Sequence, residues 1–245
     1  MIGRGTIINA LAIVIGATAG LFIKNGLPER VKQTIMQGIG LAVVMLGLSG
    51  ALQEIFLLAD NGQLERRFTM LMIFSLVAGG SLGAALRIEE RLEHFGQRLE
   101  QKFTRLKGGF ARGFITASLV YCVGAMAVVG AFEDGLTGKI ETLLSKSLLD
   151  GVSAIIFGAS LGPGVIFSAG SVLVYQGLLT LLAGLLKTVM TAELLSQMSL
   201  IGGILIMSIG LNILEITRIK VGDLLPAIFL PLVFDFLSKC WSMLV

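Results

Sequence analysis

The stretch ASLGPGVIFS, residues 159–168, places a Gly-Pro-Gly triplet inside a long apolar segment. Proline lacks a backbone N–H and its ring clashes with the preceding turn, while glycine weakens a helix on either side. Residues 152–186 are too long for one membrane span, because about 20 apolar residues suffice to cross a bilayer. We therefore divide them at the triplet into a broken or re-entrant segment over 152–167 and a helix over 168–186. The number of membrane crossings depends on this division.

The composition is that of an integral membrane protein. Hydrophobic residues make up 55% of the 245 residues and charged residues 14%, whereas a soluble domain carries about 25% charged residues. The two cysteines, Cys122 and Cys240, lie in apolar segments and form neither a disulfide framework nor a metal site. We expect an all-α, polytopic helical bundle of about seven or eight transmembrane segments, without a cofactor.

Apolar blocks predict the remaining spans. Within residues 87–112, Leu92, Phe95 and Leu99 recur at spacings of three and four, which predicts an amphipathic helix on the membrane or on the protein. Residues 133–151 are predicted to be a loop with a short amphipathic piece. Asp223 is the expected N-cap of the last helix. The other predicted membrane helices cover residues 6–23, 34–58, 68–86, 114–132, 198–215 and 224 to near the C-terminus.

Lysine and arginine mark the cytoplasmic side of a membrane protein when they lie in short loops. The 24–33 loop and the 87–112 segment both carry such residues, and they lie on one side if three spans precede the second. We therefore expect residues 87–112 in the cytoplasm and the N-terminus outside. The rule does not decide whether residues 152–167 cross the membrane or turn back, because both alternatives leave the same balance of Lys and Arg on the two sides.

An internal repeat emerges when the sequence is compared with itself at a shift of 163 residues. Gly40 then meets Gly203 and Gly47 meets Gly210, which keeps the two glycines of each segment on one helix face. If the 152–167 segment crosses the membrane, the two repeats are inverted, as is common in secondary transporters. If it turns back, the repeats are parallel.

The repeat divides a single transmembrane domain, residues 1–245, into four parts. Residues 1–87 and 168–245 are the expected three-helix repeats. Between them lie the cytoplasmic amphipathic segment over 88–112 and a central part over 113–167. This division predicts that helices one to three pair with helices six to eight.

Five long stretches of the sequence are distinctive: GTIINALAIVIGATAGL (5–21), GGSLGAALRIEERLEHFG (79–96), ITASLVYCVGAMAVVGAFEDGLTG (115–138), DGVSAIIFGASLGPGVIFSAGSVLVYQG (150–177) and GGILIMSIGLNILEITRIKVGDLLPA (202–227). They resemble the YqgA/YdfK-like family of bacterial membrane proteins, in the family's order and over essentially the whole chain. The resemblance implies a bacterial inner-membrane location and a domain of unknown function whose members are described at most as inner-membrane or transport proteins. It supplies no catalytic or binding residues.

The Gly-Pro-Gly triplet is the first candidate for a binding site. A broken helix has free N–H groups at one new end, which attract anions, and free carbonyls at the other, which attract cations. Discontinuous helices form binding sites in many transporters in this way. The alternative is a simple kink or loop between two hydrophobic helices. The residues expected to form this site are Ser160, Gly162, Pro163, Gly164 and Ser168.

Asp235 is the sharpest ionisable candidate. It falls near the middle of the helix expected from Leu224, where an ionisable group usually faces a cavity or a partner. The alternatives are an i, i+4 pair with Lys239, or a shallow helix with Trp241 at the membrane interface.

Polar residues in other expected spans complete the set of candidates. Asn9, Gln176 and Asn212 are amides that usually bridge helices, with contact to a ligand as the alternative. Ser118 belongs to TASLVYCVGAM (116–126), which echoes GASLGPGVIFS (158–168), so that Ser118 is a candidate to face Ser160. Coincidence or helix packing is the alternative.

No enzyme motif is present, since there is no Gly-x-Ser-x-Gly elbow, no His/Cys cluster and no Walker loop. The basic 87–112 segment also carries four glutamates, which favours lipid head groups over nucleic acid. Two functions stay open. One is a secondary transporter of a small polar solute or ion with a mid-membrane site at the triplet. The other is a non-transporting scaffold, channel-like or regulatory protein, and for either one a homo-oligomer stays open.

Overall fold

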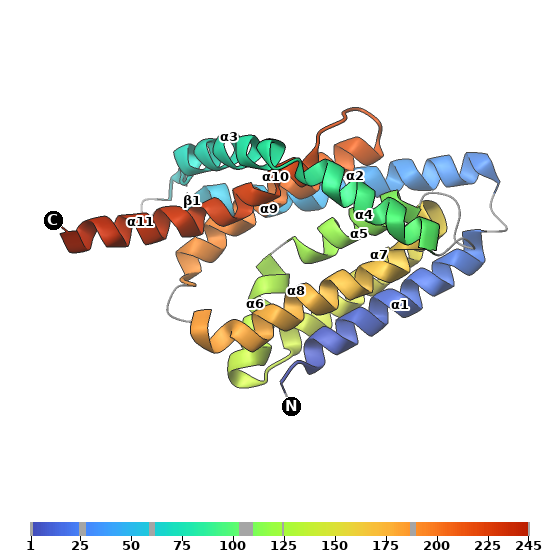
Figure 1. The fold of residues 1–245 in the computed structure, drawn as a ribbon, viewed down its shortest axis with the longest axis horizontal. Helices are drawn as coiled ribbons and strands as arrows, with labels where there is room; N and C mark the ends of the chain where they lie inside the picture. The colour runs from blue at the N-terminus through green and yellow to red at the C-terminus, as the bar shows by residue number, and fades with distance from the viewer. Residues whose placement is uncertain are drawn as a thin grey trace.

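The computed structural model of the chain describes residues 2–24, 28–58, 62–102, 110–123, 125–186 and 190–244. Within them the chain is helical except for one antiparallel β-hairpin (Figure 1). The elements are α1 (Arg4–Lys24), α2 (Glu29–Ile55), β1 (Phe56–Leu58), β2 (Leu64–Arg66), α3 (Thr69–Ala85), α4 (Ile88–Lys102), α5 (Phe110–Cys122), α6 (Ala125–Thr137), α7 (Glu141–Leu161), α8 (Gly164–Leu186), α9 (Ala192–Ile213), α10 (Val221–Leu224), the 3-10 helix η1 (Leu225–Phe229) and α11 (Leu230–Leu244).

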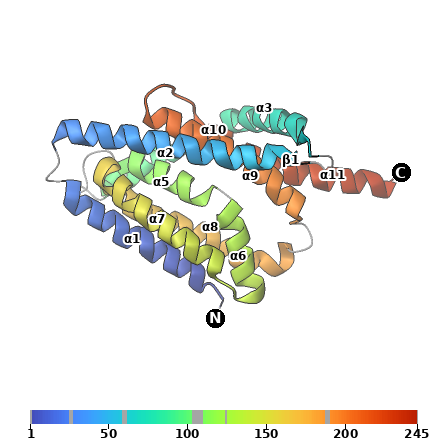
Figure 2. The ribbon, with the colours of Figure 1, turned by 180° about the vertical axis from the view of Figure 1, so that it is seen from behind.

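The helices form two groups that lie side by side (Figures 1 and 2). In the first group α1 packs on α7 and α8, and α6 packs on α7 and α8. In the second group α2 packs along α9, and α3 packs on α10 and η1. The helices α4 and α5 connect the groups, because α5 packs on α8 while α4 packs on both α5 and α10.

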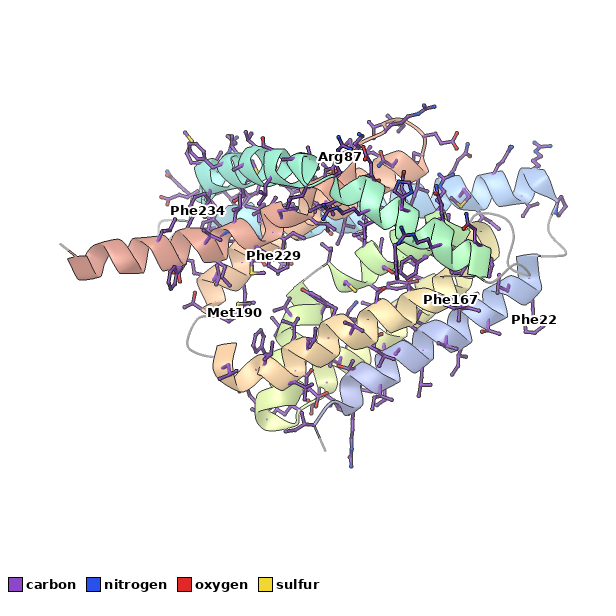
Figure 3. All side chains as sticks on the ribbon, viewed as in Figure 1. Phe22, Arg87, Phe167, Met190, Phe229 and Phe234 are labelled. Carbon is purple, nitrogen blue, oxygen red and sulfur yellow. The ribbon has the colours of Figure 1, made fainter. Side chains whose placement is uncertain are left out.

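Five of the described helices, α1, α2, α7, α8 and α9, are long and apolar enough to cross a membrane. Two bent pairs raise the number to seven if each counts as one span: α3 with α4, bent by 54°, and α5 with α6, bent by 61°. Large apolar side chains cover the outside of these helices. Phe22 on α1, for example, is 81% exposed and points away from the bundle (Figure 3). The predicted all-α, polytopic membrane bundle is thereby confirmed.

Helix α7 corrects the prediction of a loop over 133–151 followed by a span from residue 152. The helix begins at Glu141 and continues without a break to Leu161, and α6 covers residues up to Thr137. Charged residues in this stretch suggested a loop. Two of them, Lys146 and Asp150, pair with each other inside the helix, which allows both to remain in an otherwise apolar span.

The structure also differs from the prediction of one helix over 114–132. Instead of one straight span, α5 ends at Cys122 and α6 begins at Ala125, and the two are bent by 61°. The sequence between them includes Gly124, a residue that weakens a helix. The apolar composition continues across this point, so it gave no sign of the bend.

The Gly-Pro-Gly triplet is a turn between two complete helices rather than a break inside a span. The helix α7 ends at Leu161, and Gly162 has φ +89°, a conformation that favours glycine. Then α8 begins at Gly164 and runs back along the bundle. The boundaries predicted at 152, 167 and 168 are therefore corrected to a helical hairpin of 21 and 23 residues.

Glycines set the distance between α1 and α7, which run parallel. A Cβ on Gly16 would collide with the backbone of Gly151, and one on Gly158 would collide with the backbone of Ala17. Small residues allow two membrane helices to approach this closely. The α7–α8 hairpin is thus fixed on α1, with α8 antiparallel to α1 (Figure 1).

Glycines also join α2 to α9, which run antiparallel. A Cβ on Gly47 would collide with the backbone of Gly203 and Met207, and Gly40 lies against Gly210 and Leu214. These are the glycines that the internal comparison aligned, now in contact across the two segments. The antiparallel packing is the arrangement that inverted repeats would produce, although the repeat itself stays a prediction.

The last predicted helix is divided into three pieces. Pro226 and Pro231 lie in η1 and at the start of α11, where a missing N–H is tolerated. Asp223 does not cap this helix: its carboxylate accepts a 3.0 Å bond from the backbone N–H of Glu89 in α4. In return Glu89 Oε2 accepts a 2.6 Å bond from Gly222 N. Burial raises the pKa of Glu89 above its ordinary value, while the Gly222 N–H acts in the opposite direction.

Candidate functional site

Four buried polar side chains connect α1, α7 and α8. Asn9 Nδ2 of α1 donates a 3.0 Å hydrogen bond to Asp150 Oδ2 of α7 and a 3.3 Å bond to Gln176 Oε1 of α8. Lys146 lies one turn before Asp150, and its Nζ is 2.6 Å from Asp150 Oδ2. We call Asn9, Lys146, Asp150 and Gln176 the polar cluster.

The polar cluster lies deep in the bundle. Asn9 and Gln176 are fully buried, and the side chains of Lys146 and Asp150 are 8% and 10% exposed. Asp150 is near the middle of the 21-residue α7, about 14 Å from its first residue at 1.5 Å per residue. An ionisable group at such a depth is costly unless it is paired and hydrogen-bonded. The cluster supplies both the pairing and the hydrogen bonding.

Other polar atoms around the cluster have no hydrogen-bond partner. They include Asn9 Oδ1 and Gln176 Nε2, and the hydroxyls of Thr6 and Thr180, which are also buried. Thr6 lies one turn before Asn9 on α1, and Thr180 lies one turn after Gln176 on the antiparallel α8, so the threonines are on the same level. Buried polar groups in folded proteins are nearly always paired. A polar ligand could therefore supply the hydrogen bonds that these four side chains lack.

Cys122, at the end of α5, lies near Lys146 and Asp150 of the polar cluster and also lines a cavity. The neighbouring Tyr121 is fully buried, and its ring stacks on Phe157 of α7 with centroids 6.0 Å apart. The end of α5, just before the bend to α6, is therefore near both the cavity and the helix that carries the ion pair.

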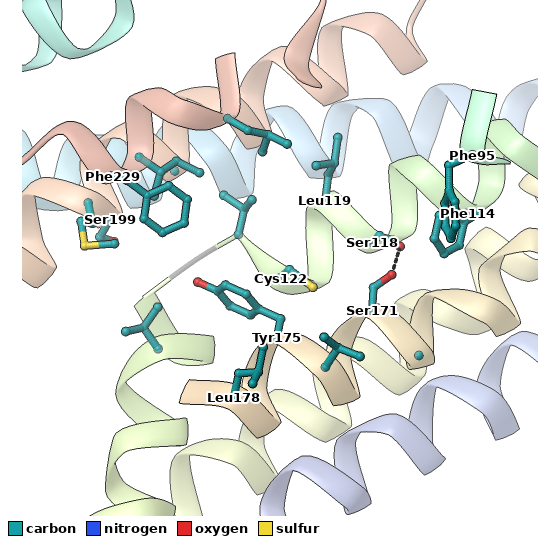
Figure 4. A pocket seen from close by; sticks show the side chains of 18 of the residues that line it. Phe95, Phe114, Ser118, Leu119, Cys122, Ser171, Tyr175, Leu178, Ser199 and Phe229 are labelled. Atoms are coloured by element: carbon teal, nitrogen blue, oxygen red, sulfur yellow. Dashed lines mark hydrogen bonds between the residues drawn. The ribbon is translucent and has the colours of Figure 1, made fainter. Parts of the chain in front are cut away.

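The cavity has a volume of about 660 Å³ and lies between α5, α6, α8, α9 and η1 (Figure 4). Its walls are almost entirely apolar, with Phe229 on one side and Leu178 on the other. Polar atoms come mainly from Tyr175, whose hydroxyl points into the space, and from Ser118, which donates a 2.9 Å hydrogen bond to Ser171.

A charged cavity lies at the other face of α5. It measures about 630 Å³ and is lined by side chains of both signs, among them Glu89, Arg112 and Lys220. A smaller cavity of about 90 Å³ shares Glu89 and Arg112 with it, and shares Leu119 with the apolar cavity. Leu119 thus lines both the smaller cavity and the apolar one.

The residues predicted at the triplet are packed against α5. A Cβ on Gly164 would collide with the carbonyl of Phe110, and Gly162 and Pro163 are buried. Local bonds use several of the backbone groups: Gly162 N donates to Gly158 O at 3.2 Å, and Ile166 N donates to Pro163 O at 3.1 Å. A binding role for this turn stays a prediction, but it is at the end of two helices and not at their middle.

The serines near the triplet differ in their partners. Ser168 is buried and donates to the carbonyl of Val165 at 2.6 Å, whereas the hydroxyl of Ser160 is buried without a partner. The suggested pairing of Ser118 with Ser160 is wrong, because Ser118 bonds to Ser171 of α8. The echo between the two sequence stretches therefore does not correspond to a contact.

The other two candidates lie away from the polar cluster. Asn212 is a structural bridge: its Nδ2 donates to Ile219 O at 2.7 Å, and its Oδ1 accepts from Ile219 N and from the hydroxyl of Thr217, both at 2.9 Å. These bonds hold the segment between α9 and α10. Asp235 is half-buried on α11, and the side chain of Lys239, its suggested partner, lies outside the described residues.

Sequence reasoning found Asn9 and Gln176 but missed Lys146 and Asp150. Both charged residues were assigned to the 133–151 loop. Their i, i+4 spacing was the available signal, since it places them on one helix face where they can pair. Among the described residues, no group of three or more His, Cys, Asp or Glu could hold a metal ion.

Comparison with known proteins places the chain in a family. Residues 4–236 match the family described as "Protein of unknown function (DUF554)". The chain belongs to the DUF554 family. The match includes every helix of the polar cluster and both sides of the cavity, and it confirms the resemblance to YqgA and YdfK seen in the sequence.

Two relatives match this chain over nearly its entire length. The "Uncharacterized membrane protein YdfK" of Bacillus subtilis (strain 168) is 32% identical over 239 residues, covering 98% of both chains. The "Uncharacterized protein YqgA" of Escherichia coli (strain K12) is 26% identical over 243 residues, covering 97% of both. No solved structure matches the chain. The likeness to YdfK and the apolar helices together show an integral, multi-pass membrane protein.

Proposed function

We propose that this DUF554 protein is a secondary transporter, or permease, of a small polar solute in the bacterial inner membrane. We place its binding site at the polar cluster, with the Gly-Pro-Gly turn as the end of the hairpin that carries Lys146, Asp150 and Gln176. The observation that carries the proposal is the buried Lys146–Asp150 pair near the middle of α7.

The first support is the cost of that pair. A helix of this length could pack on α1 with alanine or leucine at both positions, and a buried ion pair often stabilises a protein less than apolar residues of the same volume. The pair is formed within one helix, so it does not itself join two helices. Ionisable residues at such a depth in membrane proteins usually serve transport or proton transfer.

The second support is a route to the cluster. Cys122, the last residue of α5 before the bend, lines the apolar cavity and lies near the ion pair. On the opposite face, the charged cavity reaches Leu119 through the smaller one. A solute approaching from either direction would pass α5, whose residues line all three cavities.

The third support is the arrangement of the spans. The helices α1 and α8 are antiparallel, as are α2 and α9, and the glycines of α2 contact those of α9. Transporters built from inverted repeats place their solute site at the interface between equivalent helices. Asn9 and Gln176 lie at the α1–α8 interface.

A scaffold would recruit lipid or a partner through the amphipathic segment, which needs a free apolar face on α4. In the described part of α4, the apolar face is partly occupied: Phe95 remains 52% exposed but packs on Phe114 of α5 with centroids 5.9 Å apart, and Gly96 lies against Ala111. The hydrogen bonds between Glu89, Gly222 and Asp223 fix its first turn to α10. This docking favours a structural role for α4 within the transporter.

A thermal-stability screen of the purified protein against small polar metabolites tests the proposal, followed by uptake of each stabilising compound into proteoliposomes. We expect at least one compound to stabilise the protein and to accumulate in the vesicles. Asp150→Asn should abolish both effects. Glu141→Gln, an exposed carboxylate on the same helix, is the matched control and should retain both.

Two results would contradict the proposal. If stabilising compounds are bound but none crosses the vesicle membrane, transport is wrong and a regulatory function is favoured. If Asp150→Asn and Asn9→Ala both retain full uptake while folding normally, the site lies elsewhere.

A further inference from the structure

Two oxygen atoms of the polar cluster converge on one amide nitrogen. Asp150 Oδ2 accepts from both Asn9 Nδ2, at 3.0 Å, and Lys146 Nζ, at 2.6 Å. Gln176 Oε1 accepts from the same Asn9 nitrogen at 3.3 Å. Asn9 Oδ1 is buried and without a partner. The Asn9 nitrogen therefore lies between a carboxylate oxygen of α7 and an amide oxygen of α8.

An asparagine amide can present either its nitrogen or its oxygen at almost the same position, since the two groups have nearly the same shape. If the Asn9 amide turns by half a rotation, Asn9 Oδ1, Asp150 Oδ2 and Gln176 Oε1 all face one point. Three oxygens with partial or full negative charge repel one another in a buried place unless a cation lies among them. In the present arrangement the Lys146 ammonium supplies the positive charge that balances the Asp150 carboxylate.

We propose that Asp150, Asn9 and Gln176 bind a small monovalent metal cation of the Na⁺ class, and that Lys146 occupies this position on Asp150 when the cation is absent. This inference rests on the proposed function, because it names the coupling ion of the same transport site. Lys146 is then an internal competitor, and binding of the cation releases it.

The charge of the cluster selects a monovalent ion. Asp150 is its single carboxylate, and a single negative charge balances a single positive one in a region where an unbalanced charge is costly. Protein sites for Ca²⁺ use several carboxylates or carbonyls in a cage of six to eight oxygens. The described residues offer no group of three or more acidic, His or Cys side chains for such a cage.

Lys146 can leave Asp150 without moving a helix. The two residues share α7 at i, i+4 spacing, so separating them breaks no contact between helices. A lysine carries its charge on a long flexible stem that can redirect the ammonium toward a polar end of a membrane helix.

Two titratable side chains of α5, Tyr121 and Cys122, also lie beside the pair, and both interact electrostatically with Asp150. A proton is therefore the alternative occupant of the Asp150 carboxylate. A proton would need neither Asn9 Oδ1 nor Gln176 Oε1, which is why the geometry points to a metal ion. The experiment separates the two by varying Na⁺ and pH independently.

The test is thermal unfolding of the purified, detergent-solubilised full chain in NaCl, with choline chloride added to hold the ionic strength constant at fixed pH. We expect Na⁺ to stabilise the wild-type protein and to leave Asp150→Asn unaffected. Lys146→Met removes the competitor. If Lys146 occupies Asp150 at least nine-tenths of the time, the midpoint Na⁺ concentration should fall about tenfold or more.

Two controls separate cation binding from general effects on folding. Lys139→Met removes an exposed lysine in the loop before α7 and should behave as the wild-type protein. The double variant Lys146→Met/Asp150→Asn should fold, because both charges are removed together, and should show no response to Na⁺.

Identical curves in NaCl and choline chloride for both the wild-type protein and Lys146→Met would overturn the inference. Stabilisation that follows pH but not Na⁺ would overturn it too, in favour of a proton. Solute uptake that is independent of Na⁺ would leave the transporter proposal standing without this coupling ion. Na⁺-dependent stability without uptake of any solute would retain the cation site and remove the proposed function.

Discussion

The two antiparallel pairs, α1–α8 and α2–α9, are held together by opposite means. Between α2 and α9 the contacts come from glycines such as Gly47 and Gly203, whose backbones touch without polar side chains between them. Between α1 and α8 the contact includes the Asn9–Gln176 hydrogen bond, and the same amide reaches Asp150 of α7. One pair is close-packed, and the other contains hydrogen-bonding atoms without partners.

The difference indicates which pair can change. A glycine interface has no alternative arrangement nearby, because any sliding brings a side chain against a backbone. A polar interface with unused donors and acceptors can exchange its hydrogen bonds for those of a ligand. We infer that α2–α9 and the glycine-packed α1–α7 contact serve as the fixed frame, and that solute binding rearranges α8 and the polar side chains that face it.

The largest effect is expected when the ion pair beside the α1–α8 contact is disrupted. Asp150→Leu leaves the Lys146 ammonium buried without its partner and should lower stability by about 3 to 5 kcal/mol. Lys146→Met/Asp150→Leu removes both charges and should recover most of that loss. Retention on size exclusion after heating, measured for both variants, checks this. Equal losses in the single and double variants would contradict the pairing.

The next largest effect is expected when the glycine packing between α2 and α9 is disrupted. Gly47→Leu places a side chain against the backbone of Gly203 and Met207, and we expect a loss of about 3 kcal/mol from overpacking. Gly50→Leu is the matched control on the same helix, because a Cβ there meets no atom within 4 Å. Yield and thermal stability should fall for the first variant alone. A Gly47→Leu protein as stable as Gly50→Leu would show that α2 and α9 are not packed in this way.

A smaller effect compares polar groups in the two pairs. Asn9→Leu removes one hydrogen bond to Asp150 and one to Gln176, and should cost about 1 to 3 kcal/mol. Ser208→Ala, in the α2–α9 pair, should cost little, since that hydroxyl bonds only to Ile204 O of its own helix, at 2.9 Å. Thermal unfolding of both variants measures the difference, and a reversed order would remove the contrast between the pairs.

The smallest effect concerns how the first helix of each pair begins. Asp134 of α6 caps α1, accepting bonds from Gly3 N at 2.9 Å and Gly5 N at 3.0 Å, whereas α2 begins after Pro28 with no side-chain cap. Asp134→Ala should lower stability by about 1 kcal/mol. Glu133→Ala, its neighbour, should have no measurable effect. If hydrogen exchange at the first turn of α1 is the same in both variants, Asp134 is not a cap.

The sequence predicts the spans whose composition is uniformly apolar, namely α1, α2, α8 and α9. It fails for α7 because charge was taken as a sign of a loop, although the spacing of Lys146 and Asp150 allows them to pair within a helix. It also fails for the caps. Asp134 and Asp223 bond to backbone groups 131 and 134 residues away, and no local pattern can indicate partners so distant.

The sequence likewise predicted some residues of the candidate site but not how they meet. Amides in spans are visible as exceptions in apolar sequence, so Asn9 and Gln176 were found. Their meeting depends on the α7–α8 hairpin folding back along α1, which follows from glycine contacts and the turn at Gly162. The triplet that suggested a binding site thus has another effect: it brings Gln176 back beside Asp150.

The presence of both charges on one helix also has a consequence for synthesis in the cell. A lone charge at the centre of a helix makes insertion by the translocon unfavourable by about 2.5 to 3.5 kcal/mol. As soon as α7 becomes helical, Lys146 and Asp150 can neutralise each other, so this segment can partition into lipid without waiting for a neighbour. Asn9 has been synthesised before it and Gln176 comes after it, because α8 follows α7 in the chain. We therefore expect α7 to insert into the membrane before the polar cluster is complete, because Gln176 becomes available only when α8 leaves the ribosome.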